Sequence, residues 1–385
     1  MTIAILGSSG FIGGRAVEVL HLSGQDVRPI VRSFSSLARL ARFDLDCRLA
    51  DARDCAALRT AFKGCDIVVH AVTGDENIID GTLTPVYRAA QESGVRRLIY
   101  LSTASVHGQA PEPGTDETAP LRQNHALTYN NAKVRAERRL LNLRAHGEVE
   151  LVMLRPGIVF GPRSRWVHQV ARQLLDGTAY LVGDGSGICN SIYVDNVVHA
   201  IRLALRADPA NVDREAFLIG DEEEVTWSEF YGTIADALRI DRKTIHHVEA
   251  PVFKRSWNDR IDALRASSAA QSLMPMVPAG IKNAAKAAIQ GFSSKPPASS
   301  WELPQPLRPV VTQEMALLHQ CRWRFPNDKA RRCLGYSPII PFSEGCRRST
   351  QWLGFVGIPV RQQPPAETPQ VKPQFVVGQV PDGPT

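Results

Sequence analysis

Short apolar runs alternate with longer amphipathic stretches over the first 160 residues of the chain. The runs are almost uninterrupted in apolar character, as is typical of strands covered on both faces, and the stretches between them have helical periodicity. This order predicts an α/β fold built on a Rossmann-type, doubly wound parallel sheet with helices on both faces. The predicted strands are 3–6, 27–31, 67–72, 98–101 and 151–154, and the predicted helices are 16–22, 56–62, 86–92 and 132–143.

Composition and charge narrow the class of protein. The net charge of +6 is dispersed and forms no basic stripe interleaved with aromatic residues, so nucleic acid is not an expected partner. No apolar run is long enough to span a bilayer and no leader pattern opens the chain, so we expect a cytoplasmic protein without an integral membrane segment. The seven cysteines form no CxxC pair and suit reduced thiols. Because the spacing of His319, Cys321, Cys333 and Cys346 matches no zinc template, we expect no metal.

The octapeptide GSSGFIGG, residues 7–14, lies between the first predicted strand and the first predicted helix. Glycines at positions 7, 10 and 13 let the backbone turn tightly and let a diphosphate approach the first N–H groups of the helix, whose dipole attracts an anion. A plain loop would share these glycines, but the strand–helix context favours a dinucleotide site. No Lys-Ser or Lys-Thr follows Gly13, which disfavours a mononucleotide phosphate loop.

Arg32 follows the second predicted strand, at the position where an acid usually binds the adenosine ribose. An acid there would repel a 2′-phosphate, whereas a guanidinium binds one through its planar fork, so we predict NADP, with NAD as the alternative. The competing interpretation is that Arg32 is only a surface residue. A further short strand, which ends at Leu49-Ala50, counts as the third in chain order and makes 98–101 the fifth. Asp51, directly after it, is placed to accept the adenine amino group, or else to cap the helix that begins near Ala56.

A hydroxyl, a phenol and an ammonium follow in an order that predicts acid–base chemistry. Thr103 comes directly after the strand at 98–101, at the sheet edge where parallel folds bind ligands, and its hydroxyl would hold a reacting oxygen. Tyr129 and Lys133 are four residues apart and share one helical face. An ammonium and an oxidised nicotinamide would lower the phenol pKa from about 10, so Tyr129 could exchange a proton while hydride moves to or from the nicotinamide.

The spacing YxxxK is common, and the alternative is a solvent-facing helix on which Lys133 pairs with Glu137 one turn later. The order of the motifs along the chain favours a catalytic site over this alternative. A glycine turn comes first, then an acid after the third strand and a hydroxyl after the fifth, and finally the phenol and the ammonium.

Together these segments resemble the extended short-chain dehydrogenases/reductases of the NAD-dependent epimerase/dehydratase family. The resemblance rests on GSSGFIG, Asp51, His70-Ala71-Val72, LSTASVHG, YNNAK and LRPGIVFGP, covers residues 1 to about 240, and resumes at 329–338. It implies Thr103, Tyr129 and Lys133 as the catalytic residues, with Lys133 also bonding the nicotinamide ribose. The motifs and the resemblance together give a cofactor site of Gly7, Gly10, Phe11, Ile12, Gly13, Arg32, Asp51, Ala52, Ala71, Val72, Lys133, Pro156 and Ile158.

Departures from the family pattern bear on the substrate. Ala104-Ser105 stands where sugar-nucleotide dehydratases of the family have an Asp-Glu pair, which disfavours dehydration. Cys189 stands where many sugar-nucleotide epimerases use an arginine on the substrate diphosphate, and a neutral thiol cannot replace a guanidinium. Arg163 or Arg165 could still supply the missing charge.

Asn190 and the ending Tyr-Val-Asp-Asn at 193–196 resemble the 3β-hydroxysteroid dehydrogenase-like branch instead, whose members oxidise or reduce an alcohol or ketone on an apolar skeleton. His107 replaces a tyrosine common in the family, and we expect it to pack locally.

Three functions remain open. The favoured one is an NAD(P)-dependent oxidoreductase that transfers hydride between the nicotinamide and an alcohol or ketone carbon of a small-molecule substrate. The others are a sugar-nucleotide epimerase without net cofactor change and a non-catalytic NADP-binding regulator, which would need only the glycine turn and Arg32. Members of the family usually pair as homodimers through the helices at 86–92 and 132–143.

The strand–helix alternation loosens after residue 163 and returns at 192–205 and 216–219, which predicts a second lobe interleaved with the sheet. We assign residues 1–165, with 188–208 returning, to an NAD(P)-binding Rossmann domain, and residues 166–361 to a smaller substrate-binding lobe. Residues 362–385, rich in Pro and Gln, are predicted to be a disordered tail. An amphipathic pattern at 281–292, with Lys282 and Lys286 on one side, is expected to pack on the protein's own core, with contact to a membrane surface as the alternative.

Overall fold

The computed structural model describes residues 1–253 and 308–360. Its centre is a seven-stranded, fully parallel sheet in the order β10-β6-β5-β4-β1-β2-β3. The strand order reverses at β1, so the ligand crevice is expected beyond the carboxyl ends of β1 and its neighbours. The predicted Rossmann-type fold is confirmed. The strands are β1 (Thr2–Leu6), β2 (Asp26–Val31), β3 (Arg48–Leu49), β4 (Ile67–His70), β5 (Arg97–Leu101), β6 (Glu150–Pro156) and β10 (Glu215–Ile219).

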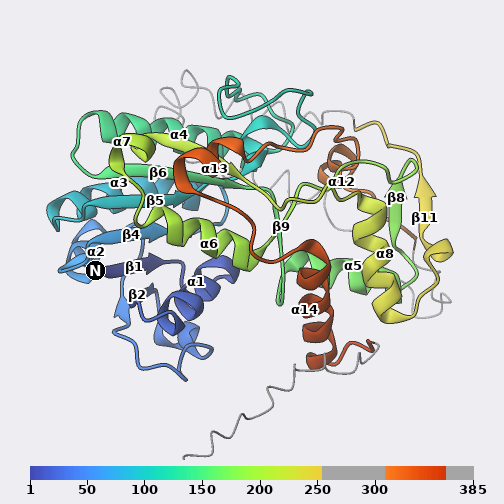
Figure 1. Cartoon of the computed structure of the whole chain (residues 1–385), viewed down its shortest axis with the longest axis horizontal. Coiled ribbons are helices and arrows are strands. Elements are labelled where there is room, and N and C mark those ends of the chain that lie inside the picture. Colours follow the sequence, from blue (N-terminus) through green and yellow to red (C-terminus); the bar gives the residue numbers. More distant parts are fainter. Residues whose placement is uncertain (254–307, 361–385) are drawn as a thin grey trace, which may run out of the picture.

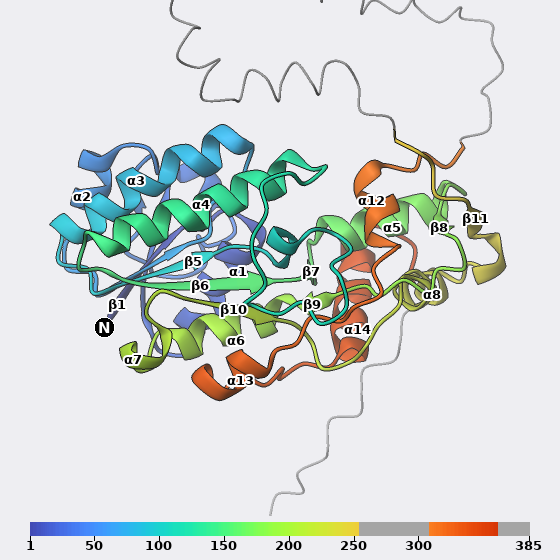
Figure 2. The ribbon, with the colours of Figure 1, turned by 90° about the horizontal axis from the view of Figure 1, so that it is seen from above.

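Helices cover both faces of the sheet (Figures 1 and 2). One face packs against α1 (Phe11–Leu22) and α6 (Val194–Ala204), and the other against α2 (Cys55–Phe62), α3 (Glu76–Glu92) and α4 (Thr128–Ala145). The short helices α7 (Pro209–Val212) and α13 (Asp328–Leu334) lie on the same side as α6 in Figure 2. Thus α13, which comes late in the chain, completes the layer over the edge strand β10.

Strand β1 shows why its sequence is an uninterrupted apolar run. Ile3 and Ile5 point into the core beneath α1 and α6, whereas Ala4 and Leu6 point into the core beneath α2, α3 and α4. Because successive side chains of a strand face opposite sides, a strand buried on both faces needs apolar residues at every position.

The second lobe has a core of its own around Trp227. Figure 1 shows it beside the carboxyl edge of the sheet, with α14 (Phe342–Phe355) packed on α5, α8 and β9. Its other elements are α5 (Arg165–Leu175), β8 (Tyr180–Val182), α8 (Trp227–Leu238), β11 (His246–Val248) and α12 (Gln313–Leu318), with β8 paired to β11. The paired strands β7 (Ile158–Phe160) and β9 (Ser191–Tyr193), which the predicted boundaries assign to the Rossmann domain, contribute Phe160 and Tyr193 to the same core.

Within the described residues the chain also forms three 3₁₀ turns: η1 (Phe34–Leu37), η2 (Ala104–His107) and η3 (Arg242–Thr244). The predicted helix at 281–292 and the predicted tail at 362–385 lie outside the described residues. Within 1–253 and 308–360, no helix combines the length and the apolar character that crossing a bilayer requires.

Candidate active site

The glycine turn between β1 and α1 has no room for side chains. Gly7 has φ +80°, and a Cβ on it would lie 2.6 Å from the carbonyl oxygen of Ala71. A Cβ on Gly13 would lie 2.3 Å from the carbonyl oxygen of Gly7. Gly10 is the N-cap of α1, where no side chain caps the helix and no acid occupies the first turn. The first N–H groups of α1 are therefore available to an anion, and the turn fits the diphosphate of a dinucleotide.

A pocket of about 220 Å³ opens from this turn along the carboxyl ends of β1, β2 and β4. It brings together seven of the residues predicted to bind the cofactor: Gly7, Gly10, Arg32, Asp51, Ala52, Ala71 and Val72. Gly13 packs beneath the turn, Phe11 lines the neighbouring cavity, and Pro156 and Ile158 flank the junction of β6 and β7. The pocket has the position and the backbone donors that a dinucleotide needs.

Asp51 does not cap the helix after it. The carboxylate of Asp54 accepts the N–H groups of Ala56 and Ala57, so the alternative role for Asp51 as helix cap is wrong. Asp51 instead accepts hydrogen bonds from the backbone and the side chain of Arg53, which lower the pKa of Asp51 to about 2. The carboxylate is thus ionised at the pocket wall and already paired with Arg53.

Arg32 is exposed and lines the same pocket. A second cation near the turn was not foreseen: Arg39 Nη2 donates a 2.5 Å hydrogen bond to the carbonyl oxygen of Ser9. The segment that carries Arg39 has no helical or strand periodicity, and a positive charge seven residues after Arg32 was its only signal.

Tyr129 lies next to this pocket without lining it. The residue is 37% exposed, and the Thr73 hydroxyl, which lines the pocket, is close enough to the phenol to lower the pKa of Tyr129. Burial of the phenol raises the pKa of Tyr129, the Thr73 hydroxyl and the positive charge of Arg165 oppose that rise, and the negative charge of Glu314 adds to it. Two second-lobe residues, one of them the Arg165 considered for substrate charge, thus approach the phenol.

Lys133 lies beneath the site, and its side chain is only 2% exposed. Its Nζ donates to the phenol oxygen of Tyr100, 3.1 Å away, and to the carbonyl oxygen of Leu101, 2.9 Å away. Burial lowers the pKa of Lys133 to about 8. The alternative of a solvent-facing Lys133–Glu137 pair is therefore wrong.

That Lys133 and an oxidised nicotinamide together lower the pKa of Tyr129 stays a prediction. The two residues share one helical face, but the Lys133 ammonium is bonded into the end of β5, and the pKa of Tyr129 is raised by burial. Thr103 is nearby as expected at the end of β5, where its Oγ1 accepts the N–H of Ser105 at 3.2 Å and begins η2.

Glu137, one turn beyond Lys133, is buried in an ionic cluster. Arg155 Nη2 lies 2.6 Å from Glu137 Oε2, and Ser102 Oγ donates to Glu137 Oε1 at 2.5 Å. Arg155 Nη1 lies 3.1 Å from His107 Nε2, and burial lowers the pKa of His107 to about 4. His107 thus packs locally, as expected. The cluster joins α4 to β6 and to Ser102, which directly follows β5 and precedes Thr103.

Cys189 is buried beside a cation that comes from much later in the chain. A small pocket is lined by Cys189, Asn190, Arg155 and Arg324, and Asn190 Oδ1 accepts the N–H of Phe325 at 2.9 Å. Arg324 therefore places positive charge near the position where epimerases of the family use arginine. It was missed because pairwise spacing does not connect residues 135 positions apart.

A glycine turn on the amino end of α1, a pocket along the carboxyl edge of a parallel sheet and a phenol next to it define a dinucleotide-binding enzyme fold. The family model "NAD dependent epimerase/dehydratase family" matches residues 3–220. The chain belongs to this family of NAD-dependent enzymes.

Named relatives include hydroxysteroid dehydrogenases. The chain is 27% identical to 3β-hydroxysteroid-dehydrogenase/decarboxylase isoform 1 of Arabidopsis thaliana, over 83% of this chain and 68% of that protein; the match to isoform 2 covers half of that protein. It is 26% identical to 2-alkyl-3-oxoalkanoate reductase of Stenotrophomonas maltophilia, over 90% of this chain and 98% of that protein. The crystal structure of UDP-glucuronic acid 4-epimerase from Bacillus cereus in complex with NAD superposes with a TM-score of 0.64 at 17% identity, covering 92% of this chain and 99% of that one.

Proposed function

We propose that the protein is an NAD(P)-dependent oxidoreductase that transfers hydride between the nicotinamide and an alcohol or ketone carbon, with Tyr129 as the general acid or base. The observation that carries the proposal is that helix α4 brings Lys133 to the end of β5 and the Tyr129 phenol close to Thr73, which lines the pocket that begins at the glycine turn. The phenol therefore lies where the dinucleotide pocket meets the second lobe.

The cofactor supplies the hydride chemistry when bound, and the chain's residues bind it. The N–H groups at the amino end of α1 suit the diphosphate, the carboxylate of Asp51 suits the adenine amino group, and the guanidinium of Arg32 suits a 2′-phosphate. The last of these makes NADP the proposed cofactor.

The raised pKa of Tyr129 bears on the direction of proton transfer. A phenol with a pKa above its ordinary value of about 10 is protonated at neutral pH and suited to give its proton to a carbonyl oxygen. Thr103 would hold the same oxygen. Lys133, bonded to the carbonyl oxygen of Leu101, presents its ammonium at the end of β5, where a ribose hydroxyl could accept from it. These roles serve the reduction of a ketone, and the same groups in reverse serve the oxidation of an alcohol.

The names of two relatives suggest the substrate class: a ketone or secondary alcohol on an apolar skeleton, as in a steroid or a 2-alkyl-3-oxo acid. A second candidate, sugar-nucleotide epimerisation, is favoured by one observation. Arg324 lines the pocket of Cys189 and could bind the substrate diphosphate that the thiol cannot.

Tyr129→Phe tests the proposal. With NADPH and either a 3-ketosteroid or a 2-alkyl-3-oxo acid, the wild type should lose absorbance of the reduced cofactor, and the variant should lose at least about a hundredfold in kcat with cofactor affinity within a few-fold. Tyr231→Phe is the matched control, since Tyr231 is buried in the second-lobe core and donates to Gln173. Retained activity of Tyr129→Phe would overturn the role, and conversion of a UDP-sugar without cofactor turnover would favour the epimerase.

A further inference from the structure

A second cavity, larger than the cofactor pocket, lies next to it. It measures about 690 Å³ and lies on the outer side of the glycine turn, between α1, residues 34–42 and α14. Its walls are partly apolar, formed by Phe11, Leu40, Trp352 and by Phe355, which is 88% exposed. Five guanidinium groups also line it, those of Arg15, Arg39, Arg42, Arg163 and Arg348. A cavity of this size suits a small molecule.

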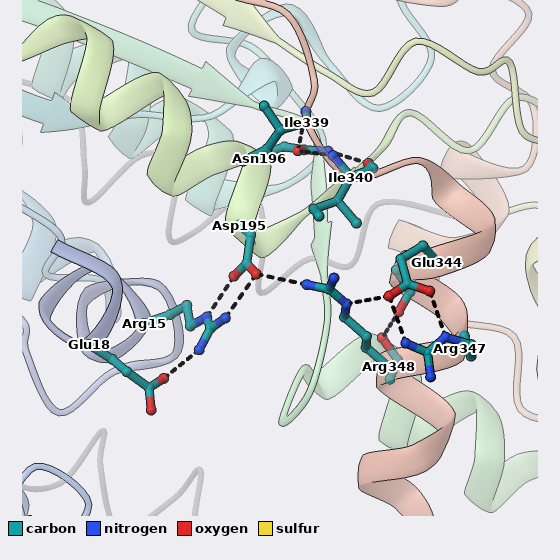
Figure 3. Close-up of polar contacts among 11 residues, drawn as sticks. Arg15, Glu18, Asp195, Asn196, Ile339, Ile340, Glu344, Arg347 and Arg348 are labelled. Carbon is teal, nitrogen blue, oxygen red and sulfur yellow. Dashed lines mark hydrogen bonds and ion pairs between the residues drawn. The ribbon is translucent and has the colours of Figure 1, made fainter. Parts of the chain in front are cut away.

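Three of these five arginines are already paired with acids. Figure 3 shows Arg15 and Arg348 converging on Asp195, with Arg15 Nε 2.6 Å from Oδ1 and Arg348 Nη1 3.5 Å from Oδ2. Arg348 also donates to Glu344, and Arg42 is paired with Glu18. Arg15 and Arg348 thus hold α1, α6 and α14 together, and Arg42 ties its own segment to α1. The paired acids leave these three side chains little charge to attract a ligand.

Arg39 and Arg163 have no carboxylate partner within the described residues. Arg39 is held by its bond to the carbonyl oxygen of Ser9, inside the glycine turn. Arg163 has φ +77°, a backbone conformation that L-residues seldom adopt, and it comes directly before Ser164, the N-cap of α5. Partial burial lowers the pKa of both groups, and the charge of Arg39 further lowers the pKa of Arg163. The two cations therefore repel each other across the cavity.

We propose that Arg39 and Arg163 form a phosphate-binding site on the outer side of the glycine turn. Two planar guanidinium groups suit a phosphate, which accepts several charge-assisted hydrogen bonds and removes the repulsion between the two cations. Ser9 and Ser36 line both this cavity and the cofactor pocket, so the bound phosphate lies beside the turn. Its source is either the dinucleotide itself, clamped between the sheet domain and the second lobe, or a separate phosphate ester with an apolar part.

Equilibrium binding to the full chain tests the site, with NADPH and inorganic pyrophosphate as probes in titration calorimetry. We expect Arg39→Gln and Arg163→Gln each to weaken phosphate binding about tenfold, the loss of one charge-assisted bond. Arg163→Lys keeps the charge but not the planar guanidinium, so its phosphate affinity should lie between those of the wild type and Arg163→Gln. The matched control is Arg42→Gln, because Arg42 lines the same cavity but is paired with Glu18, and its affinities should stay within about twofold.

The two possible sources of the phosphate, the cofactor and a separate ester, give different results in this titration. If the cofactor supplies the phosphate, both Arg→Gln variants weaken NADPH and pyrophosphate competes with NADPH. If a separate ester does, pyrophosphate binds alongside NADPH and only its affinity falls. Unchanged affinities for both probes in correctly folded variants, checked by thermal unfolding, would overturn the site. The experiment with NADPH rests on the proposed function, but it measures binding, whereas Tyr129→Phe measures turnover. The phosphate site and the proposed function can therefore fail independently of each other.

Discussion

Glu137 and Arg155 form an ion pair with side chains only 1% and 5% exposed, one helical turn past Lys133 and directly under Ser102. The pair lies between α4 and the two strands that end at the site. A charge buried at such a place needs its partner, because the protein around it cannot replace the solvation lost on folding.

Glu137→Gln should lower the free energy of unfolding by about 3–5 kcal/mol, since it leaves the Arg155 guanidinium buried without a counter-charge. Urea denaturation followed by fluorescence measures this change. The matched control is Glu92→Gln, which removes the partner of Arg59 from an exposed pair at 3.5 Å and should cost less than about 1 kcal/mol. Equal changes in the free energy of unfolding for the two variants would show that the buried pair stabilises the fold no more than the exposed one.

Stability should fall as the solution is acidified, in part through His319. This residue stacks on Trp227 in the second-lobe core, its Nδ1 accepts the N–H of Val182 at 2.9 Å, and burial lowers the pKa of His319 to about 4. An unfolded histidine titrates near 6.5, so between pH 6.5 and 4 the unfolded chain binds the proton and the folded chain does not. The stabilisation is complete above pH 6.5, and about 3 kcal/mol of it is lost by pH 4.

His319→Gln should flatten that part of the pH dependence, measured by urea unfolding at several pH values from 7 to 4. His70 and His107, whose pKa values burial also lowers, to about 3 and about 4, keep a residual slope. The exposed His146 provides the control, and His146→Gln should leave the curve unchanged. A slope as steep in His319→Gln as in the wild type would contradict the assignment.

The strands of the sheet were predictable because burial on both faces leaves a simple trace in the sequence. Residues 3–6 are apolar throughout since Ile3 and Ala4 face different helical layers, and β2, β4, β5 and β6 follow the same logic. Helix α13 could not be placed in this way. Its position over β10 depends on packing between segments about 110 residues apart, for which periodicity gives no signal.

The site was predictable in its parts but not in their orientation. Spacing by four residues puts Tyr129 and Lys133 on one helical face. The difference lies in burial: Lys133 turns inward to the carbonyl oxygen of Leu101, whereas Tyr129 turns outward to Thr73 and the second lobe. Arg324 and Glu314 were missed for a related reason, since only the tertiary fold brings these residues to the first domain.

Gly13→Ala should disrupt the glycine turn. The added Cβ would lie 2.3 Å from the carbonyl oxygen of Gly7, and the obstacle is backbone that cannot move without opening the turn. We expect roughly 1–3 kcal/mol of destabilisation and at least about tenfold weaker NADPH binding. Gly220→Ala is the control, because nothing lies within 4 Å of a Cβ there. Thermal unfolding and NADPH fluorescence measure both effects, and unchanged binding in Gly13→Ala would mean that the cofactor does not rest on this turn.

Arg32→Ala decides between the two nicotinamide cofactors. If the Arg32 guanidinium binds a 2′-phosphate, its removal should weaken NADPH by about tenfold or more and leave NADH almost unchanged, because only NADPH carries that group. Arg53→Ala controls for the general loss of positive charge, since Arg53 lines the same pocket but is paired with Asp51 at 2.9 Å. Dissociation constants of both cofactors for the three proteins give the ratio directly. Equal losses of affinity for NADPH and NADH in Arg32→Ala would mean that Arg32 is only a surface residue and that the pocket binds NAD.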